Sequence, residues 1–281
     1  MANRFDLQGK YLVSGLLLAE TGLRIGGMTE GIEIGGVDNP VIRDPLSGRP
    51  YVPGSSLKGK LRHLLEWSLG KIEVHPKHRG YTAHFCGECD ACVIFGVSSD
   101  DTEVRLKAGP SRLLVRDAFP TAETVRLWDT WLGERVYTEL KNENYLDRVT
   151  SAANPRTMER VPAGSRFSFE IVFDIYEDAD RDRMAQVFRA MYLLENSAMG
   201  GSGSRGHGQV KFTDLKVEER PRDHYLAGAQ PMPRFSARSH PEKEYPERPA
   251  KHQVAVPKSE EIDFEVSLPR YVAEQWGALG R

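Results

Sequence analysis

Residues 22–62 read GLRIGGMTEGIEIGGVDNPVIRDPLSGRPYVPGSSLKGKLR, so a glycine-rich acidic loop leads directly into a basic helix. The helix is indicated by four leucines that recur at helical spacing: Leu57, Leu61, Leu64 and Leu65. Their shared face is expected to lie on a hydrophobic core. Ser55 or Ser56 is the expected cap at the start of this helix, and Gly70 is expected to end it.

A second face of the same helix is basic. Lys58 and Arg62 are four residues apart and share it, and Lys60 lies nearby. Ser55 and Ser56 add hydroxyls and unpaired backbone N–H groups at the positive end of the helix dipole, where anions bind. This combination predicts a phosphate-binding surface. The alternative is an ordinary solvated amphipathic helix with a good cap.

The loop before the helix combines small residues with negative charge. Six glycines permit close backbone approach or positive φ: Gly22, Gly26, Gly27, Gly31, Gly35 and Gly36. Four carboxylates accompany them: Glu30, Glu33, Asp38 and Asp44. Beside a phosphate site, such a loop is suited to hold a divalent cation. For Asp38, which precedes Asn39-Pro40, closing a turn is the alternative role.

The rest of the chain supplies further elements of an α+β domain. Alternating or β-prone patterns predict strands at residues 9–20, 112–119, 165–176 and 208–217. A second helix is predicted over about residues 180–198, ending at Gly200-Gly201. The resulting order β-α-β-β-α-β is that of a ferredoxin-like (RRM-type) domain, which commonly presents its sheet to RNA. Three long insertions interrupt it, at about residues 22–54, 71–101 and 136–164.

The three cysteines of the chain are clustered in one insertion. Cys86, Cys89 and Cys92 form a C-x2-C-x2-C run, with His84 two residues upstream. An odd number of cysteines excludes a disulfide framework that pairs all of them, and the spacing predicts a four-coordinate structural zinc site. His75 and His78 are rival donors for the fourth position. Reduced thiols without a metal are the alternative.

Two other segments carry RNA-binding potential. Residues 201–206, GSGSRG, satisfy G-x-G-x-x-G but follow a helix and precede a strand, the reverse of a dinucleotide site. Gly203, Ser204 and Arg205 are instead suited to a phosphodiester, or simply to a long turn. The insertion at 136–164 holds Arg148 and Arg156 among aromatic residues, a mixture able to contact nucleic acid, or a solvated hairpin.

Together, five motifs resemble those of the RAMP proteins, and in particular the backbone subunit of the type III-A CRISPR effector, the Csm complex. They are GLRIGG (22–27), IGGVDNPVIRDP (34–45), YVPGSSLKGKLR (51–62), SAANPR (151–156) and GGSGSRGHG (200–208). The resemblance implies a ferredoxin-like RAMP core, a thumb hairpin at 136–164 that interrupts the guide–target duplex, a Cys/His zinc cluster, and a glycine-rich loop next to RNA. It marks Asp38 as catalytic. Arg24 stands where many relatives carry histidine, which suits phosphate binding.

The function that the resemblance implies is a CRISPR RNA-binding backbone subunit. It is expected to form a filament with further copies of itself along the guide RNA, to contact other subunits of the type III effector, and to cleave complementary target RNA. Asp38 is expected to hold Mg²⁺ or Mn²⁺ so that the RNA's own 2′-OH attacks the adjacent phosphate. A non-cleaving RAMP scaffold is the first alternative, and a zinc-stapled protein-interaction module is a more distant one.

Bulk properties are compatible with this interpretation. The 281 residues are 40% hydrophobic, enough for a buried core, and the formal net charge of −2 requires any RNA site to be a localised basic surface. We find no apolar run of membrane-spanning length and no signal peptide, which predicts a cytoplasmic protein with no membrane partner. Residues 1–220 are predicted to form the RAMP domain. Residues 221–281 hold eight of the 17 prolines and are expected to form an extension, partly disordered and outside the core.

Overall fold

The computed structural model describes residues 5–26, 40–74, 81–82, 84–239, 260–261 and 266–279. Its centre is an antiparallel sheet with the strand order β9-β1-β8-β4. The strands are β1 (Gly9–Ala19), β4 (Leu113–Val115), β8 (Arg166–Ile175) and β9 (Val210–Pro221). The helices α1 (Gly54–Ser68) and α5 (Asp178–Glu195) connect them. This is the topology of a ferredoxin-like domain, so the predicted α+β fold class is confirmed.

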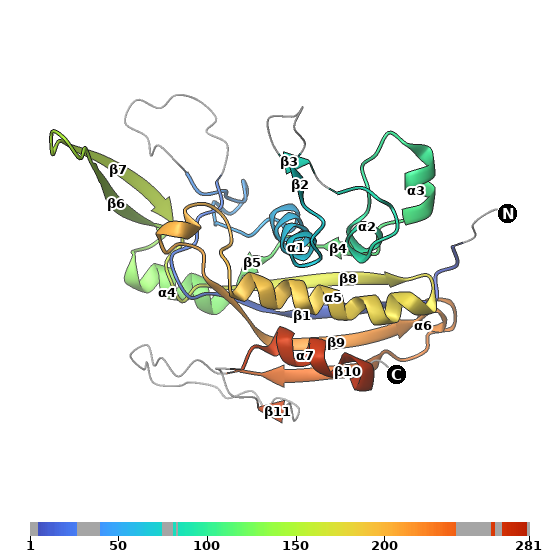
Figure 1. The fold of residues 1–281 in the computed structure, drawn as a ribbon. Coiled ribbons are helices and arrows are strands. Elements are labelled where there is room, and N and C mark those ends of the chain that lie inside the picture. Colours follow the sequence, from blue (N-terminus) through green and yellow to red (C-terminus); the bar gives the residue numbers. More distant parts are fainter. Residues whose placement is uncertain are drawn as a thin grey trace.

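The helices and the sheet form two layers with the core between them (Figure 1). The sequence pattern explains the burial of α1, since Leu57, Leu61 and Leu65 are completely or almost completely buried and Leu64 packs at the edge. Alternate residues of β1 face the same core, among them Tyr11 and Val13. Among the described residues, no helix is both long and apolar enough to cross a lipid bilayer.

The start of α1 differs from the prediction. The residue that caps it is Pro53, and neither Ser55 nor Ser56 caps the helix, so that expectation is wrong. The N–H of Gly54 donates instead to the Asp117 carboxylate at 2.7 Å. Asp117 lies where the predicted strand 112–119 is interrupted, between β4 and the short β5 (Phe119–Pro120). A remote side chain thus satisfies the first backbone donor of the helix.

The insertions carry their own elements. The insertion at residues 71–101 holds the predicted metal ligands and is called the metal segment. It contains β2 (Glu73–Val74), β3 (Tyr81–Thr82) and α2 (Asp90–Phe95), and α3 (Thr102–Ala108) follows it. After β5 come α4 (Ala122–Trp131) and the hairpin of β6 (Glu139–Leu146) and β7 (Ala153–Arg160). Figure 1 shows this hairpin projecting from the body of the molecule. A 3₁₀ turn, η1 (Gly203–Arg205), lies between α5 and β9.

The C-terminal extension joins the core, which corrects the expectation that it lies outside. After α6 (Arg222–Ala227), β10 (Met232–Arg238) pairs with β9, and β11 (Glu260–Glu261) pairs with β10. The last helix, α7 (Leu268–Leu279), packs beside α5 through Leu268, Val272 and Trp276, all of them buried. These three residues have a strict four-residue spacing that the preceding proline-rich run obscures. The domain boundary near residue 220 stays a prediction.

We expect Trp276→Ala to destabilise the whole domain. The Trp276 indole packs against Tyr11 and Phe188 with ring centroids 5.2 and 5.3 Å away, and its N–H donates to the Arg181 carbonyl at 2.6 Å. Emptying such a site costs about 3–5 kcal/mol. The exposed Trp131 provides the control, since Trp131→Ala removes the same side chain from the surface. Equal unfolding free energies for the two variants in urea would contradict the docking of α7.

Candidate nucleic-acid interface and metal centre

The predicted metal ligands lie close together in the metal segment. Donor atoms of His84, Cys86, Cys89 and Cys92 all lie within 4.8 Å of one another. The sulfurs of Cys86 and Cys92 are 3.9 Å apart, close to the separation of about 3.8 Å that two thiolates have around tetrahedral zinc. The loop from Cys86 to the start of α2 brings the ligands together, because Cys89 precedes the helix and Cys92 lies one turn into it.

The chemistry of these four donors fits a metal ion. His84 Nε2 is buried and lacks a hydrogen-bond partner in the described structure. Cys86 Sγ accepts hydrogen bonds from the N–H groups of Glu88 and Cys89. A hydrogen bond from the Cys92 thiol lowers the pKa of Cys89 to about 5, and the same bond raises the pKa of Cys92. A Cys₃His set with a thiolate already favoured is a donor set that zinc prefers. His75 and His78 lie outside the described residues.

Arg62 ties the metal cluster to α1. Its guanidinium donates to the carbonyl of His84 at 2.9 Å, to the carbonyl of Gly96 at 2.8 Å, and to Glu66 at 2.7 Å. Lys58, one turn earlier, donates to the Leu113 carbonyl at 2.7 Å, and burial lowers its pKa. Lys58 and Arg62, which share the predicted phosphate-binding face, therefore bind neighbouring segments of the protein itself. Their assignment to RNA stays a prediction, as do those of Lys60, Ser55 and Ser56.

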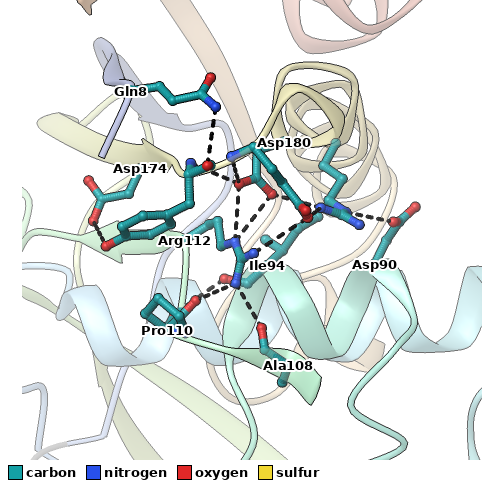
Figure 2. Close-up of polar contacts among 12 residues, drawn as sticks. Gln8, Asp90, Ile94, Ala108, Pro110, Arg112, Asp174 and Asp180 are labelled. Carbon is teal, nitrogen blue, oxygen red and sulfur yellow. Dashed lines mark hydrogen bonds and ion pairs between the residues drawn. The ribbon is translucent and has the colours of Figure 1, made fainter. Parts of the chain in front are cut away.

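A buried ion pair on α5 also helps to hold the metal segment in place (Figure 2). Arg112 Nε lies 3.2 Å from the fully buried Asp180 carboxylate, and Arg112 also donates to the carbonyls of Ala108 and Pro110 at 2.7 Å. Arg183 joins Asp180 to Asp90 of α2. Sequence reasoning missed this cluster, because its partners are far apart in the chain and form no motif. It explains why the metal segment has a fixed place on α5.

We expect Arg62→Ala to act mainly on the metal segment. The substitution removes the donor that the half-buried His84 and Gly96 carbonyls share with Glu66, at a cost of about 2–4 kcal/mol. Zinc content after dialysis and the melting temperature are both expected to fall. Lys60→Ala removes a half-buried cation from the same helix and serves as the control. A loss of RNA affinity with unchanged zinc content and stability would instead show that Arg62 binds RNA phosphates.

The glycine-rich loop of residues 200–208 binds the backbone of Arg24. The N–H of Gly201 donates to the Arg24 carbonyl at 2.8 Å, and Gly200 forms a bridge to Arg24. A Cβ at Gly200 would lie 2.0 Å from that carbonyl oxygen, so glycine is required there. Ser202 and Gly206 adopt left-handed backbone conformations at the two ends of η1, which exposes Ser204 and Arg205 to solvent.

The β6–β7 hairpin packs its base on the same loop. Glu143 of β6 lies 3.3 Å from Arg205, and Lys141 lies 3.1 Å from His207. Toward the tip, the predicted RNA contacts Arg148 and Arg156 are exposed. Exposed apolar side chains accompany them: Leu140, Tyr145, Leu146 and Val149. The hairpin thus offers both cations and apolar surface to a ligand that also contacts the glycine-rich loop.

Asp38 lies outside the described residues, but both ends of its loop are placed. Gly26 bridges to Val41, and the Ile42 N–H donates to the Ile25 carbonyl at 2.9 Å. The Val41 N–H also donates to Glu159 of β7 at 2.7 Å. Burial acts to raise the pKa of Glu159, but hydrogen bonds from Thr138, Val41 and Arg43 outweigh it, so the pKa is lowered. Segment 27–39 therefore starts and ends at the base of the hairpin.

The comparisons with known proteins agree with this arrangement. Residues 17–211 match the family model of the RAMP superfamily. The chain belongs to the RAMP superfamily. This RAMP chain is 44% identical over 233 residues to the CRISPR system Cms endoribonuclease Csm3 of Methanothermobacter thermautotrophicus, covering 79% of the chain and 91% of the relative. The protein of the same name from Streptococcus thermophilus is 39% identical over 214 residues, covering 74% of the chain and 89% of the relative.

Solved structures are similar to the RAMP chain as well. A chain of the Csm3–Csm4 subcomplex in the type III-A CRISPR-Cas interference complex is 33% identical and superposes with a TM-score of 0.53, over 81% of this chain and 90% of that one. Csm3 of Methanopyrus kandleri gives 30% identity and a TM-score of 0.56, over 79% and 80%. The resemblance inferred from the five sequence motifs is confirmed.

Proposed function

We propose that this chain is an RNA-binding backbone subunit of a type III CRISPR effector and that it cleaves target RNA complementary to the bound guide. The observation that carries the proposal is the convergence of three RAMP elements: the Arg24 segment, the glycine-rich loop and the base of the projecting hairpin. The curated relatives, which are named endoribonucleases, support the catalytic part. We further propose that copies of the chain assemble along the guide beside other subunits of the effector.

The exposed and half-exposed cations contact the RNA backbone. Arg24 and Arg205 lie around the glycine-rich loop, where Gly203 and Ser204 allow a phosphate to approach closely. On the hairpin, Arg148 and Arg156 contact phosphates, while the exposed apolar residues wedge against bases. At the start of α1, the hydroxyls of Ser55 and Ser56 and the ammonium of Lys60 extend the same path. The sequence of the guide is read by base pairing and not by these groups.

In this proposal the RNA's own 2′-oxygen is the nucleophile of the cleavage reaction, and Asp38 holds the metal ion that assists it. The 2′-oxygen of the target attacks the adjacent phosphorus, the bond from phosphorus to the 5′-oxygen breaks, and the products carry a 2′,3′-cyclic phosphate and a 5′-hydroxyl. The proton of the 2′-OH leaves to solvent and one from solvent reaches the 5′-oxygen. Mg²⁺ or Mn²⁺, when bound, supplies charge stabilisation at the phosphate. Asp38 is the carboxylate that holds it, and no serine or cysteine nucleophile is required.

Zinc has a structural role in this proposal. Four protein donors leave no open coordination position, which separates the Cys₃His site from a catalytic zinc centre. The metal instead closes a segment whose described residues form one short helix and two-residue strands. Its contribution to RNA binding is indirect, through the orientation of α1 and the loops around it.

Native purification followed by a cleavage assay tests the proposal. We expect the chain, produced with its effector partners, to copurify with guide RNA and to cut a complementary RNA in the presence of Mg²⁺ or Mn²⁺. A non-complementary RNA of equal length is the control. Copurified RNA without cleavage would favour the non-cleaving scaffold. Absence of nucleic acid, judged from the absorbance ratio and a gel, would favour a zinc-stapled protein-interaction module.

A further inference from the structure

One carboxylate stands among the cations that join the hairpin to the glycine-rich loop. Glu143 Oε1 lies 2.9 Å from Lys141 Nζ and 3.2 Å from His207 Nε2, and Glu143 Oε2 lies 3.3 Å from Arg205 Nη1. Glu139, Lys141 and Glu143 alternate along β6 and share its inward face. Glu143 therefore contacts both Lys141 and Arg205, the two partly exposed cations between the hairpin and the glycine-rich loop.

The protonation of His207 follows from its surroundings. The side chain is completely buried, and its Nδ1 has no hydrogen-bond partner in the described structure. The other ring nitrogen, Nε2, lies 3.2 Å from Glu143 Oε1 and 3.1 Å from Lys141 Nζ, so the neutral ring either donates to the carboxylate or accepts from the ammonium. Burial lowers the pKa of His207, and the nearby Lys141 adds to this effect, so the ring is neutral at pH 7. His207 thus contacts the Lys141–Glu143 ion pair without adding charge.

The charged groups in contact with the Glu143 carboxylate are thus two cations, Lys141 and Arg205. The hydrogen bond from Lys141, followed by those from His207 and Arg205, lowers the pKa of Glu143 to about 2, so the carboxylate is ionised at pH 7. Arg205 is 57% exposed and its contact with Glu143 is long, which is the geometry of a weak surface ion pair. A phosphate that approaches the glycine-rich loop therefore competes with Glu143 for Arg205 and Lys141.

We propose that Glu143 is an intramolecular counter-ion that occupies Arg205 and Lys141 until an RNA phosphate replaces it, and that it thereby sets the affinity of this RNA site. The inference rests on the proposed function, since it concerns the same RNA. The anion that replaces it is a phosphodiester, because a phosphodiester carries one negative charge, as the Glu143 carboxylate does. The residue acts on binding and is not a catalytic residue.

Glu143→Gln tests the inference, because glutamine keeps the size and an acceptor oxygen but removes the charge. We expect the full-length variant to bind a labelled single-stranded RNA of mixed sequence about three- to tenfold more tightly than the wild-type chain in fluorescence anisotropy. The slope of log affinity against log salt is expected to steepen by about 0.7, the value of one additional phosphate contact on a single strand. The melting temperature checks that the variant is folded.

Glu139→Gln is the matched control. It removes the same charge from the same face of β6, but its partner is Arg160, which is only 22% exposed. A general change in surface charge predicts equal gains for the two variants, and that outcome would overturn the inference. Unchanged or weaker binding by Glu143→Gln would overturn it too, in favour of a carboxylate that merely orders its neighbours.

A double-mutant cycle assigns the effect to Arg205. If Glu143 acts by occupying this guanidinium, most of the gain of Glu143→Gln is expected to disappear when Arg205→Ala is also present. A full gain in the double variant would overturn the counter-ion role toward Arg205. The proposed function fails in a different way, because a wild-type chain without affinity for RNA would fail it before any variant is compared.

Discussion

Asp38→Asn is expected to abolish cleavage of the target RNA while leaving guide binding and assembly intact. Asparagine keeps the size of the side chain and much of its ability to accept hydrogen bonds, but it lacks the charge that a hard divalent cation requires. We expect the rate of cutting to fall at least about a hundredfold, since even residues that only support a metal ligand cost 10–100-fold. The measurement is single-turnover cleavage by assembled complexes with added Mg²⁺ or Mn²⁺.

Asp44→Asn is the control for this result. Asp44 lies six residues later in the same acidic loop, and it accepts hydrogen bonds from the backbone N–H and the hydroxyl of Ser47 in a solvent-exposed turn. A collective acidic field would make both neutralisations cost a similar, modest amount. A specific metal ligand predicts one severe loss. If Asp38→Asn lost RNA and assembly together with cutting, Asp38 would be a structural residue, and undiminished cutting would remove it from the catalytic assignment.

The parts of the fold that could be predicted are those with a local period. The leucines of α1 recur every three to four residues, and the alternation of β8 has a period of two, so both elements follow from the chain itself. The same logic was available for α7, whose Leu268, Val272 and Trp276 are four residues apart. The proline-rich composition before this helix hides it, because composition averaged over the whole extension predicts disorder.

The unpredicted parts depend on partners that are distant in the sequence. Lys58 and Arg62 have the pattern of a phosphate surface, yet they bind carbonyls 55, 22 and 34 residues away. The first N–H of α1, that of Gly54, binds Asp117, 63 residues away, and neither adjacent serine caps the helix. Sequence patterns place a charge on a face, but they do not say which segment covers that face. Only the folded chain distinguishes a free cation from one that ties two segments together.

The candidate RNA site shows an intermediate case. The motifs predicted Arg24, Arg205 and the hairpin separately, and the structure brings them together at one junction. Glu143 was not singled out, although a signal for it exists: the run from Glu139 to Glu143 alternates charged with neutral residues, as expected of a strand with a charged face against the body of the molecule. Such alternation identifies the face but not the identity of its partners.

Cys89→Ser is expected to release the bound zinc and to destabilise the chain strongly. A hydroxyl is a poor zinc ligand, and a structural zinc site contributes its binding free energy to folding. Losing the metal belongs to the class of changes that cost about 4 kcal/mol or more, which lowers the melting temperature of a domain of this size by roughly 10 °C. Zinc per chain is measured by mass spectrometry of metals after purification without chelators.

Because the chain has only three cysteines and all of them lie in the cluster, this measurement has a clear interpretation. Glu88→Gln is the control: Glu88 is exposed in the same loop and pairs with Lys107 at 3.2 Å, so its neutralisation is expected to leave the zinc in place. His84→Ala then distinguishes the histidine donors, since retention of one tightly held zinc would assign the fourth position to His75 or His78. Wild-type protein purified without zinc would contradict the site as a whole, because the buried His84 nitrogen and the clustered thiols would then have to be stable with no metal between them.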